Sequence, residues 1–348
     1  MQYEIDFLAV GEWEKWWDAI AIRYGDFADP LNQYVVVIDG GNKESGQKLV
    51  EHIKKHYNTS YVDLVVVTHL HQDHASGLTE VLEGLTVGKI AMHLPWSYTE
   101  DIKKMTKTES SKVNLETKLE KSISTISTLQ DLAIEKNIEI IEPFAGHRLL
   151  NDNFLVLGPS KDYYTTLLAN FKNTPDVKEE HNIIDDVITF AKSTFEWWIE
   201  ESLHIETLSD DYEDTTPENN SSLILLFEIA GKKFLFTGDA WKDALIKAIT
   251  YSESIGSSVS NIDFLDVPHH GSKRNLGPSI LNHIKPRSAY ISCPKEWDPK
   301  HPSRKVVNAL LRRECIVHAT RWNHLWHNVV RDWWSAATSE SFFDQVEK

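Results

Sequence analysis

The sequence predicts an α+β protein whose strands end at loops that carry histidine and aspartate. The run of mostly branched residues at 62–67 is typical of a strand buried on both faces. It ends at the sequence THLHQDH, residues 68–74, and a second apolar strand at 263–267 ends at PHHGS, residues 268–272. Because a rigid sheet can aim the loops that follow its strands, both loops are candidates for a functional site.

The segments before the first histidine loop predict an opening β-meander and one helix. Apolar side chains alternate or cluster between turn signals, and the sequence DGGN at 39–42 supplies a glycine turn. We expect these elements in order: strands at 2–10, 18–24 and 33–39, a helix at about 44–56, and, after the histidine loop, a strand near 89–93.

Two stretches with a different composition predict helical insertions at about 97–137 and 160–218, within a single domain that spans 1–348. In the first insertion, apolar residues recur at helical intervals, namely Leu115, Leu119, Ile123, Ile126 and Leu129. In the second we expect helices at about 163–171 and 183–201 and a mobile loop at 209–214.

The remaining elements lead to the second histidine loop. We expect strands at 138–141 and 153–157, a hairpin of 222–229 and 232–237, a helix near 241–250, and the strand at 263–267. The hairpin turn is Ala230-Gly231. Its second strand runs into the sequence TGD, residues 237–239, so an aspartate also follows a strand here.

The composition is that of a soluble globular protein, with 41% hydrophobic and 25% charged residues in a chain of 348. The first ten residues lack a basic region followed by an apolar stretch, and no later segment is apolar for long enough to span a bilayer. We therefore expect a cytoplasmic protein. Its two cysteines, Cys293 and Cys315, lie in apolar contexts and are expected to be buried thiols.

The net charge of −16 is unevenly distributed. Residues 161–218 hold fifteen acidic and four basic side chains, whereas residues 268–331 hold three acidic and twelve basic ones. The total charge disfavours binding along long nucleic acid, but the basic part contains the second histidine loop. This distribution favours an anionic substrate, although a charged stretch is more often only a solvated surface.

The donors in the first loop suit a divalent metal ion. Imidazole nitrogens and a carboxylate at the spacing HxHxDH match the ligands that Zn²⁺ takes at about 2 Å. A polar loop with incidental histidines is the alternative, and the specific spacing counts against it.

The spacing HxHxDH resembles the signature of the metallo-β-lactamase superfamily of dinuclear metallohydrolases, and the resemblance implies a four-layer αββα sandwich. It also implies the ligands of two ions: His69 and His71 for one, and Asp73 and His74 for the other. Asp239 would bridge the two ions, and one histidine of the pair His269 and His270 would complete the second site. Which of these two binds is left open.

Four further segments resemble the ComEC/Rec2-type branch of this superfamily, here without its membrane channel. They are NNSSLILL at 219–226, KFLFTGDA at 233–240, VPHHGS at 267–272 and HPS at 301–303. The wider superfamily places a further histidine before the bridging aspartate, where this chain has Asn219. The ion at His69 and His71 is therefore expected to have a weaker amide or water ligand, and Mn²⁺ becomes an alternative to Zn²⁺.

Other residues are candidates for catalysis and substrate binding. Asp73 and His301 are the candidate catalytic residues, because His301 could protonate a leaving group, although it could equally cap a helix. Lys273 and Arg274 are candidates for holding a phosphate, with exposed basic side chains of no special role as the alternative. Ser272 and Asn220 are also assigned to substrate binding.

The region 297–348 is rich in tryptophan and arginine and could stack bases or bind a protein partner. The residues concerned are Trp297, Trp322, Trp326, Trp333 and Trp334, with Arg312, Arg313 and Arg321 nearby. Packing in a core or an interface is the preferred interpretation of these side chains.

The sequence thus predicts a metal-dependent hydrolase with two divalent ions, most simply Zn²⁺. The favoured activity is cleavage of a phosphodiester in DNA, RNA or a nucleotide through a metal-activated hydroxide. Hydrolysis of an ester, lactone or amide is the alternative in the same fold. A third hypothesis is a partner-binding component of a larger complex that keeps the fold as a scaffold.

Overall fold

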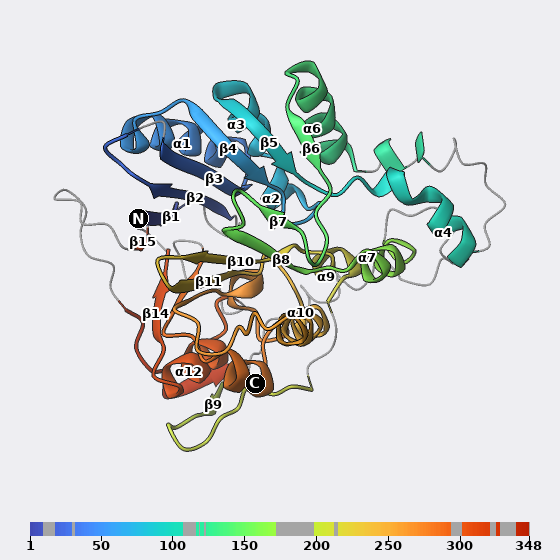
Figure 1. Cartoon of the computed structure of the whole chain (residues 1–348). Coiled ribbons are helices and arrows are strands. Elements are labelled where there is room, and N and C mark those ends of the chain that lie inside the picture. The colour runs from blue at the N-terminus through green and yellow to red at the C-terminus, as the bar shows by residue number, and fades with distance from the viewer. Residues whose placement is uncertain are drawn as a thin grey trace.

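The computed structural model describes residues 1–9, 18–29, 32–106, 116–117, 119–121, 123–171, 198–211, 215–293, 301–320, 325–327 and 339–347. These residues form two seven-stranded sheets that face one another, and helices cover the outer face of each sheet (Figure 1). This arrangement is a four-layer αββα sandwich, and the predicted fold class is confirmed.

The first sheet has the strand order β15-β1-β2-β3-β4-β5-β6. Its strands are β15 (Leu325–His327), β1 (Gln2–Phe7), β2 (Ala19–Gly25), β3 (Gln33–Gly40), β4 (Tyr61–Val66), β5 (Thr86–Ala91) and β6 (Glu139–Ile141). Strands β1, β2 and β3 pair antiparallel, which confirms the opening meander, and β3 to β6 pair parallel. The carboxyl ends of β3, β4 and β5 and the start of β2 therefore meet at one edge.

The second sheet has the strand order β14-β13-β12-β11-β10-β8-β7. Its strands are β14 (Ile316–Ala319), β13 (Ser288–Ile291), β12 (Phe264–Asp266), β11 (Lys232–Phe236), β10 (Ile224–Ile229), β8 (Phe154–Gly158) and β7 (Arg148–Leu149). The predicted hairpin is confirmed as β10 and β11, with Ala230 at φ 50° and Gly231 at φ 73°. Two consecutive positive φ angles are those of a type I′ turn, which matches the twist of the paired strands.

Helices pack on both outer faces because each sheet has apolar side chains on two sides. On the first sheet lie α1 (Lys43–His52), which continues as the π-helix η2 (Ile53–Tyr57), α3 (Leu78–Gly84) and α6 (Ser124–Glu135). On the second lie α10 (Lys242–Ser254), α11 (Pro278–Ile284) and α12 (Arg304–Arg312). The shorter helices are α2 (Gln72–Ala75), η3 (Pro95–Tyr98), α4 (Thr99–Thr106), α7 (Lys161–Leu168), α9 (Pro217–Asn220) and η4 (Pro268–Gly271).

Aromatic side chains fill the core between the two sheets. Phe7 of the first sheet contacts Phe264 of the second with ring centroids 5.7 Å apart, and Phe154 stacks on Phe227 at 4.4 Å. Each such pair adds about 0.5–1.5 kcal/mol to the stabilisation from burial. This core fixes the sheets against one another, and thereby the loops at their shared edge.

The insertions differ in part from the predictions. Leu119, Ile123, Ile126 and Leu129 are buried as expected, and Leu115 lies outside the described residues. The described part of the first insertion has α4, further helical residues at 116–117 and 119–121, and α6. Most of the predicted helix at 183–201 also lies outside the described residues, and the prediction is wrong at its end. There Trp198–Glu200 forms strand β9, which pairs with β16 (Gln345–Glu347), far away in the sequence.

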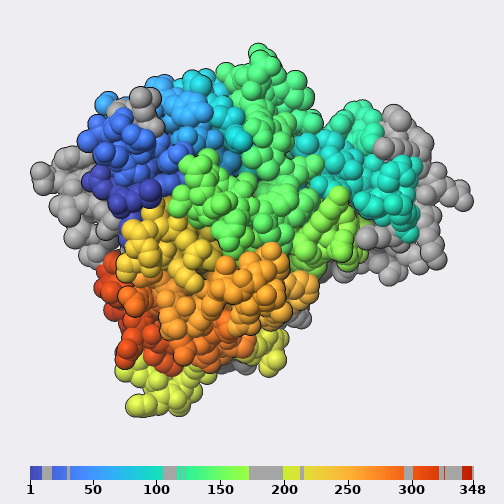
Figure 2. Space-filling model, in the orientation of Figure 1, coloured from blue at the N-terminus to red at the C-terminus, as the bar shows by residue number. Residues whose placement is uncertain are grey.

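The acidic residues 198–211 lie on the outer side of the second sheet's helices, where Figure 2 shows them in yellow-green. Arg312 is 2.9 Å from Glu201, and Arg313 is 2.7 Å from Glu206. Asp210 accepts hydrogen bonds from the backbone and hydroxyl groups of Ser279, so the described part of the predicted mobile loop is anchored. These ion pairs neutralise part of the charge of the acidic stretch 161–218 and of the basic stretch 268–331. Arg312 and Arg313 are thus engaged with carboxylates.

Both cysteines are free and buried, as predicted. Among the described residues, no helix is long and apolar enough to cross a membrane. Of the tryptophans noted near the C-terminus, Trp297, Trp322, Trp333 and Trp334 lie outside the described residues, as do Arg321 and the side chain of Trp326.

Candidate metal centre

The two histidine loops and the TGD segment meet at the edge where β4, β11 and β12 end. Close glycine contacts hold the first loop against the end of β3. A Cβ at Gly77 would lie 1.9 Å from the carbonyl oxygen of Gly40, and a Cβ at Gly46 would lie 2.0 Å from that of Gly77. Since no side chain fits there, glycine is required for α1 and β3 to approach the histidine loop.

His74 is fully buried and is oriented by Asp39, which follows the third strand. His74 Nδ1 is 2.7 Å from Asp39 Oδ2, and a carboxylate can only accept, so Nδ1 carries the proton. Asp39 also accepts hydrogen bonds from the backbone and hydroxyl groups of Thr68. The hydrogen bond of Nδ1 thus leaves Nε2 as the atom of His74 that faces the site.

His69 is oriented in the same way by Thr68. The hydroxyl of Thr68 donates its single proton to Asp39, at 2.6 Å, so it can only accept from His69 Nδ1, at 3.1 Å. Nε2 of His69 therefore carries a lone pair, and His71 Nδ1 lies 3.1 Å from this nitrogen. At this distance two imidazole nitrogens either share a proton or bind one cation.

The second loop supplies two more histidines with the same tautomer. The backbone at His269 and His270 has φ of 50° and 54°, so the two rings leave the chain in different directions. His269 Nδ1 is 3.2 Å from Asn275 Oδ1, and His270 Nδ1 is 3.1 Å from the carbonyl oxygen of Ser292. Both acceptors leave Nε2 of each ring as the atom that could bind a metal ion.

Asp239 lies between these histidines. Its Oδ1 is 3.4 Å from His74 Nε2, and its Oδ2 is 3.6 Å from His69 Nε2 and 3.7 Å from His269 Nε2. Within the described residues, neither His74 Nε2 nor Asp239 Oδ1 has a hydrogen-bond partner. Donors bound about 2.1 Å from a tetrahedral ion are about 3.4 Å apart, so these atoms fit divalent metal ions.

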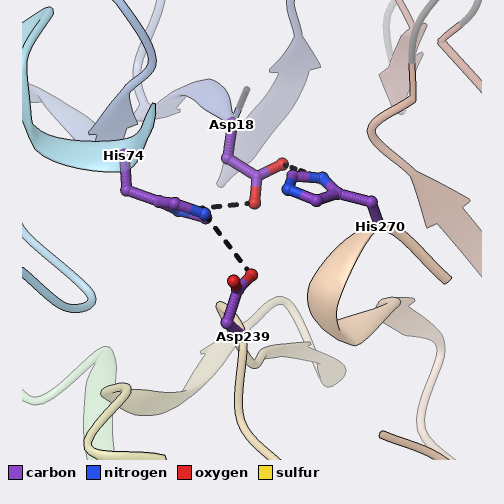
Figure 3. A group of neighbouring side chains, drawn as sticks. All are labelled: Asp18, His74, Asp239 and His270. Atoms are coloured by element: carbon purple, nitrogen blue, oxygen red, sulfur yellow. Dashed lines mark ion pairs between the residues drawn. The ribbon is translucent and has the colours of Figure 1, made fainter. Parts of the chain in front are cut away.

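The donor atoms of the described residues form three overlapping groups, each within 4.8 Å: Asp18, His74, Asp239 and His270; Asp39, His69 and His74; and His69, His71 and Asp239. Figure 3 shows the first group, with Asp18 between the rings of His74 and His270 and with Asp239 on the other side of His74. Two groups therefore share Asp239, as expected of a carboxylate that bridges two ions.

The electrostatics of the site keep its carboxylate ionised. Burial alone would raise the pKa of Asp239, but His269, His74 and His69 outweigh it and hold that pKa well below its usual value. Burial together with His74 lowers the pKa of His69, which is therefore a neutral imidazole near neutral pH. Burial would also lower the pKa of His74, but Asp239 and Asp39 raise it well above the usual value.

The structure brings together most of the predicted site residues. His69, His71, His74, Asp239, His269 and His270 converge as described, and the ring of His301 stacks on that of His269 with centroids 5.5 Å apart. Asp73 is half-buried on α2 and belongs to none of the three donor groups found among the described residues.

The predicted substrate-binding residues surround this centre. Ser272 is buried, and its hydroxyl accepts from the backbone N–H of Arg274, so it also stabilises the turn. Lys273 is half-buried, Arg274 is exposed, and Asn220 is buried on α9. Their role in substrate binding stays a prediction.

Two aspartates of the site were not predicted from the sequence. Asp18 directly precedes β2 and Asp39 ends β3, and the pairing of Ala19 with Gly40 places both at the edge where β4 ends. The signal in the sequence was one aspartate directly before β2 and another at the end of β3. It could be used only once the sheet order was known.

A small cavity lies beside His69 and is lined by His93, Tyr164 and Ser221 among others. Its volume of about 10 Å³ has room for about one water molecule. His93 is buried between the rings of Phe144 and Tyr164, and its Nε2 is 2.6 Å from the carbonyl oxygen of Pro143. Burial lowers the pKa of His93 to about 4.

His93 is expected to make the fold less stable in acid. Because its pKa is about 4 when folded and about 6.5 when unfolded, the unfolded chain binds more protons between these pH values. The free energy of unfolding should fall by about 3 kcal/mol from this group as the pH falls from 7 to below 4. Urea unfolding of metal-free wild type and His93→Gln at several pH values measures the difference.

The variant His93→Gln should lose about 3 kcal/mol of the pH dependence that the wild type shows. Parallel pH profiles for wild type and His93→Gln would show that the prediction is wrong.

Comparisons with known proteins agree with this fold. Residues 31–164 match the model of the metallo-beta-lactamase superfamily. The chain is 33% identical over 121 residues to ComE operon protein 3 of Bacillus subtilis, covering 35% of this chain and 15% of that protein. It is 31% identical over 162 residues to Recombination protein 2 of Haemophilus influenzae, covering 45% of this chain and 19% of that protein.

The chain therefore spans less than a fifth of the length of either relative. A solved metallo hydrolase from the archaeon Ignicoccus hospitalis aligns with 94% of this chain and 100% of its own, at 10% identity and a TM-score of 0.43.

The αββα sandwich with a histidine and aspartate centre at its edge is the metallo-β-lactamase fold. Residues 31–164 match the model of that superfamily, and the chain is similar to the ComEC/Rec2 proteins, as the sequence motifs predicted.

Proposed function

We propose that this protein is a two-metal phosphodiesterase that acts on a nucleic acid or a nucleotide. The observation that carries the proposal is the position of Asp239. One of its oxygens faces His74, and the other faces His69 and His269, so a single buried carboxylate can hold two ions side by side. Bound divalent ions would supply a water of lowered pKa and would offset charge on a phosphoryl group.

The residues divide into two proposed ligand sets that share Asp239. His69 and His71 form one with Asp239, and Asp18, His74 and His270 form the other. The set with two carboxylates is the harder one, so it suits Mn²⁺ as well as Zn²⁺. His269 is close to the oxygen of Asp239 that faces His69, which places the two adjacent histidines on opposite sides of that carboxylate.

Other side chains support a phosphodiester over an ester as the substrate. His301 stacks on His269 and is the proposed proton donor to the leaving oxygen, while Lys273 and Arg274 are proposed to bind phosphate oxygens. Arg312 and Arg313 are paired with carboxylates and are not part of this proposal. One relative is named for recombination, which favours a nucleic acid as the substrate.

Metal analysis combined with a substrate panel tests the proposal. Protein reconstituted with Zn²⁺ or Mn²⁺ should hold two ions per chain and should cleave bis(p-nitrophenyl) phosphate faster than p-nitrophenyl esters. A panel of single-stranded DNA, duplex DNA, RNA and cyclic nucleotides then identifies the substrate class. Faster turnover of the esters would favour the ester, lactone or amide hydrolase, and absence of bound metal would favour a partner-binding component.

A further inference from the structure

Asn219 is the residue at which the resemblance to the wider superfamily implies a further histidine. It lies on α9, whose N-cap Thr216 accepts a hydrogen bond from the Asn219 backbone. Its side chain is 4% exposed and approaches His269, with Asn219 Nδ2 3.4 Å from His269 Nδ1. The amide is therefore buried directly against a proposed ligand.

The orientation of a neighbouring amide, that of Asn275, can be assigned without ambiguity. Asn275 Nδ2 donates to the carbonyl oxygens of Asp239 and Ala240, at 3.0 and 3.2 Å. Carbonyl oxygens only accept, so this end of the amide must be nitrogen. The other end, Oδ1, faces His269 Nδ1 at 3.2 Å, and His269 Nδ1 therefore carries a proton that it donates to Asn275.

This proton determines how the amide of Asn219 must be oriented. An NH2 group that faced the N–H of His269 would place two donors against one another. Oxygen and nitrogen of an amide are exchanged by a half-turn about one bond, and the hydrogen-bond network decides between the two orientations. With Oδ1 of Asn219 facing His269 Nδ1, the repulsion is removed and the NH2 group takes the other position.

That other position is buried, and within the described part of the chain its atom has no hydrogen-bond partner. A buried donor without a partner is costly, so a native structure is expected to supply one. The other end of the same amide contacts the proposed ligand His269, so this position lies next to the proposed metal centre. Because the oxygen of the amide is directed to His269, the group available there is a donor and not a metal ligand.

We propose that Asn219 binds a non-bridging oxygen of the phosphoryl group through its amide NH2. This inference rests on the proposed phosphodiesterase function and deepens it, since it assigns a donor that discriminates an anionic tetrahedral group. Such a donor would contribute without adding charge to a centre that would hold two cations.

The binding of inorganic phosphate to the metal-loaded protein tests this role, measured by titration calorimetry. Asn219→Ala should keep two ions and bind phosphate about 10- to 100-fold more weakly, because a hydrogen bond to a charged group is lost. Asn219→Asp keeps the size of the side chain and an acceptor for His269, but replaces the NH2 group by a second oxygen. It should weaken phosphate binding by at least as much as Asn219→Ala.

Asn153→Ala is the control, because it also removes a side-chain amide, one that donates to the backbone carbonyl of Glu228 at the start of β8. This variant should keep the phosphate affinity of the wild type. Equal phosphate affinity in Asn219→Ala and wild type would overturn the proposal, and so would loss of an ion from Asn219→Ala. If the wild type binds phosphate but cleaves no phosphodiester, the proposed function fails while the result for Asn219 still stands.

Discussion

Asp239→Asn is expected to remove both ions and to lower kcat/KM for phosphodiester cleavage by at least about 10³-fold, equivalent to about 4 kcal/mol of transition-state stabilisation. The carboxylate is placed between His74 on one side and His69 and His269 on the other, at 3.4 to 3.7 Å. An amide of the same size has a single oxygen, and its NH2 group would face one of the two ions. One ligand set then lacks an oxygen donor, and the other has a neutral oxygen in place of a charged one.

Elemental analysis and thermal unfolding check this prediction together. A ligand that binds only the folded state stabilises it, so added Zn²⁺ or Mn²⁺ should raise the Tm of the wild type but not of Asp239→Asn. The nearby Asp243→Asn is the matched control, since Asp243 accepts from Tyr163 and pairs with Lys247 near the surface. It should keep two ions per chain, and two retained ions in Asp239→Asn would contradict the bridging position.

Much of the fold follows from patterns that are local in the sequence. The hairpin of β10 and β11 is set by a two-residue turn and apolar strands on either side, so neighbouring residues contain all the information. The first histidine loop is equally local, because its donors lie within six residues of one another. Such features can be predicted from a single sequence.

Features that depend on distant pairing could not be predicted in this way. Trp198–Glu200 were expected at the end of a helix but form strand β9, because they pair with β16 near the C-terminus. The anchoring of Asp210 likewise depends on Ser279, which lies on α11 and is distant in the sequence. A propensity argument for one segment contains no information about the segment that packs against it.

The candidate site shows the same division. Its histidines were predicted from their motifs, but Asp18, Asp39 and Asn275 enter through sheet order and side-chain hydrogen bonds. Each of these three is an ordinary turn or strand-end residue in the sequence. Their contribution is to orient the rings or to add an oxygen donor, and this becomes visible only from the distances.

Asp18→Asn is expected to remove one of the two ions and to lower kcat/KM by about 100-fold, or about 2.7 kcal/mol. Asp18 is buried beside His74 and His270, with its oxygens 3.6 and 3.9 Å from their Nδ1 atoms. Both Nδ1 protons are donated elsewhere, to Asp39 and to a carbonyl oxygen. Neither of these protons is therefore donated to Asp18, and its carboxylate can bind a cation.

The motif and the structure assign the fourth ligand of this ion differently, and the two assignments can be separated. The spacing HxHxDH favours Asp73, whereas the donor groups of the described residues contain Asp18. Metal content of Asp18→Asn and Asp73→Asn, measured side by side, distinguishes them. One ion in Asp18→Asn is the expected result. Two ions in Asp18→Asn and one in Asp73→Asn would show that Asp18 only orients its neighbours. A carboxylate that binds no cation can be replaced by an amide without loss of metal.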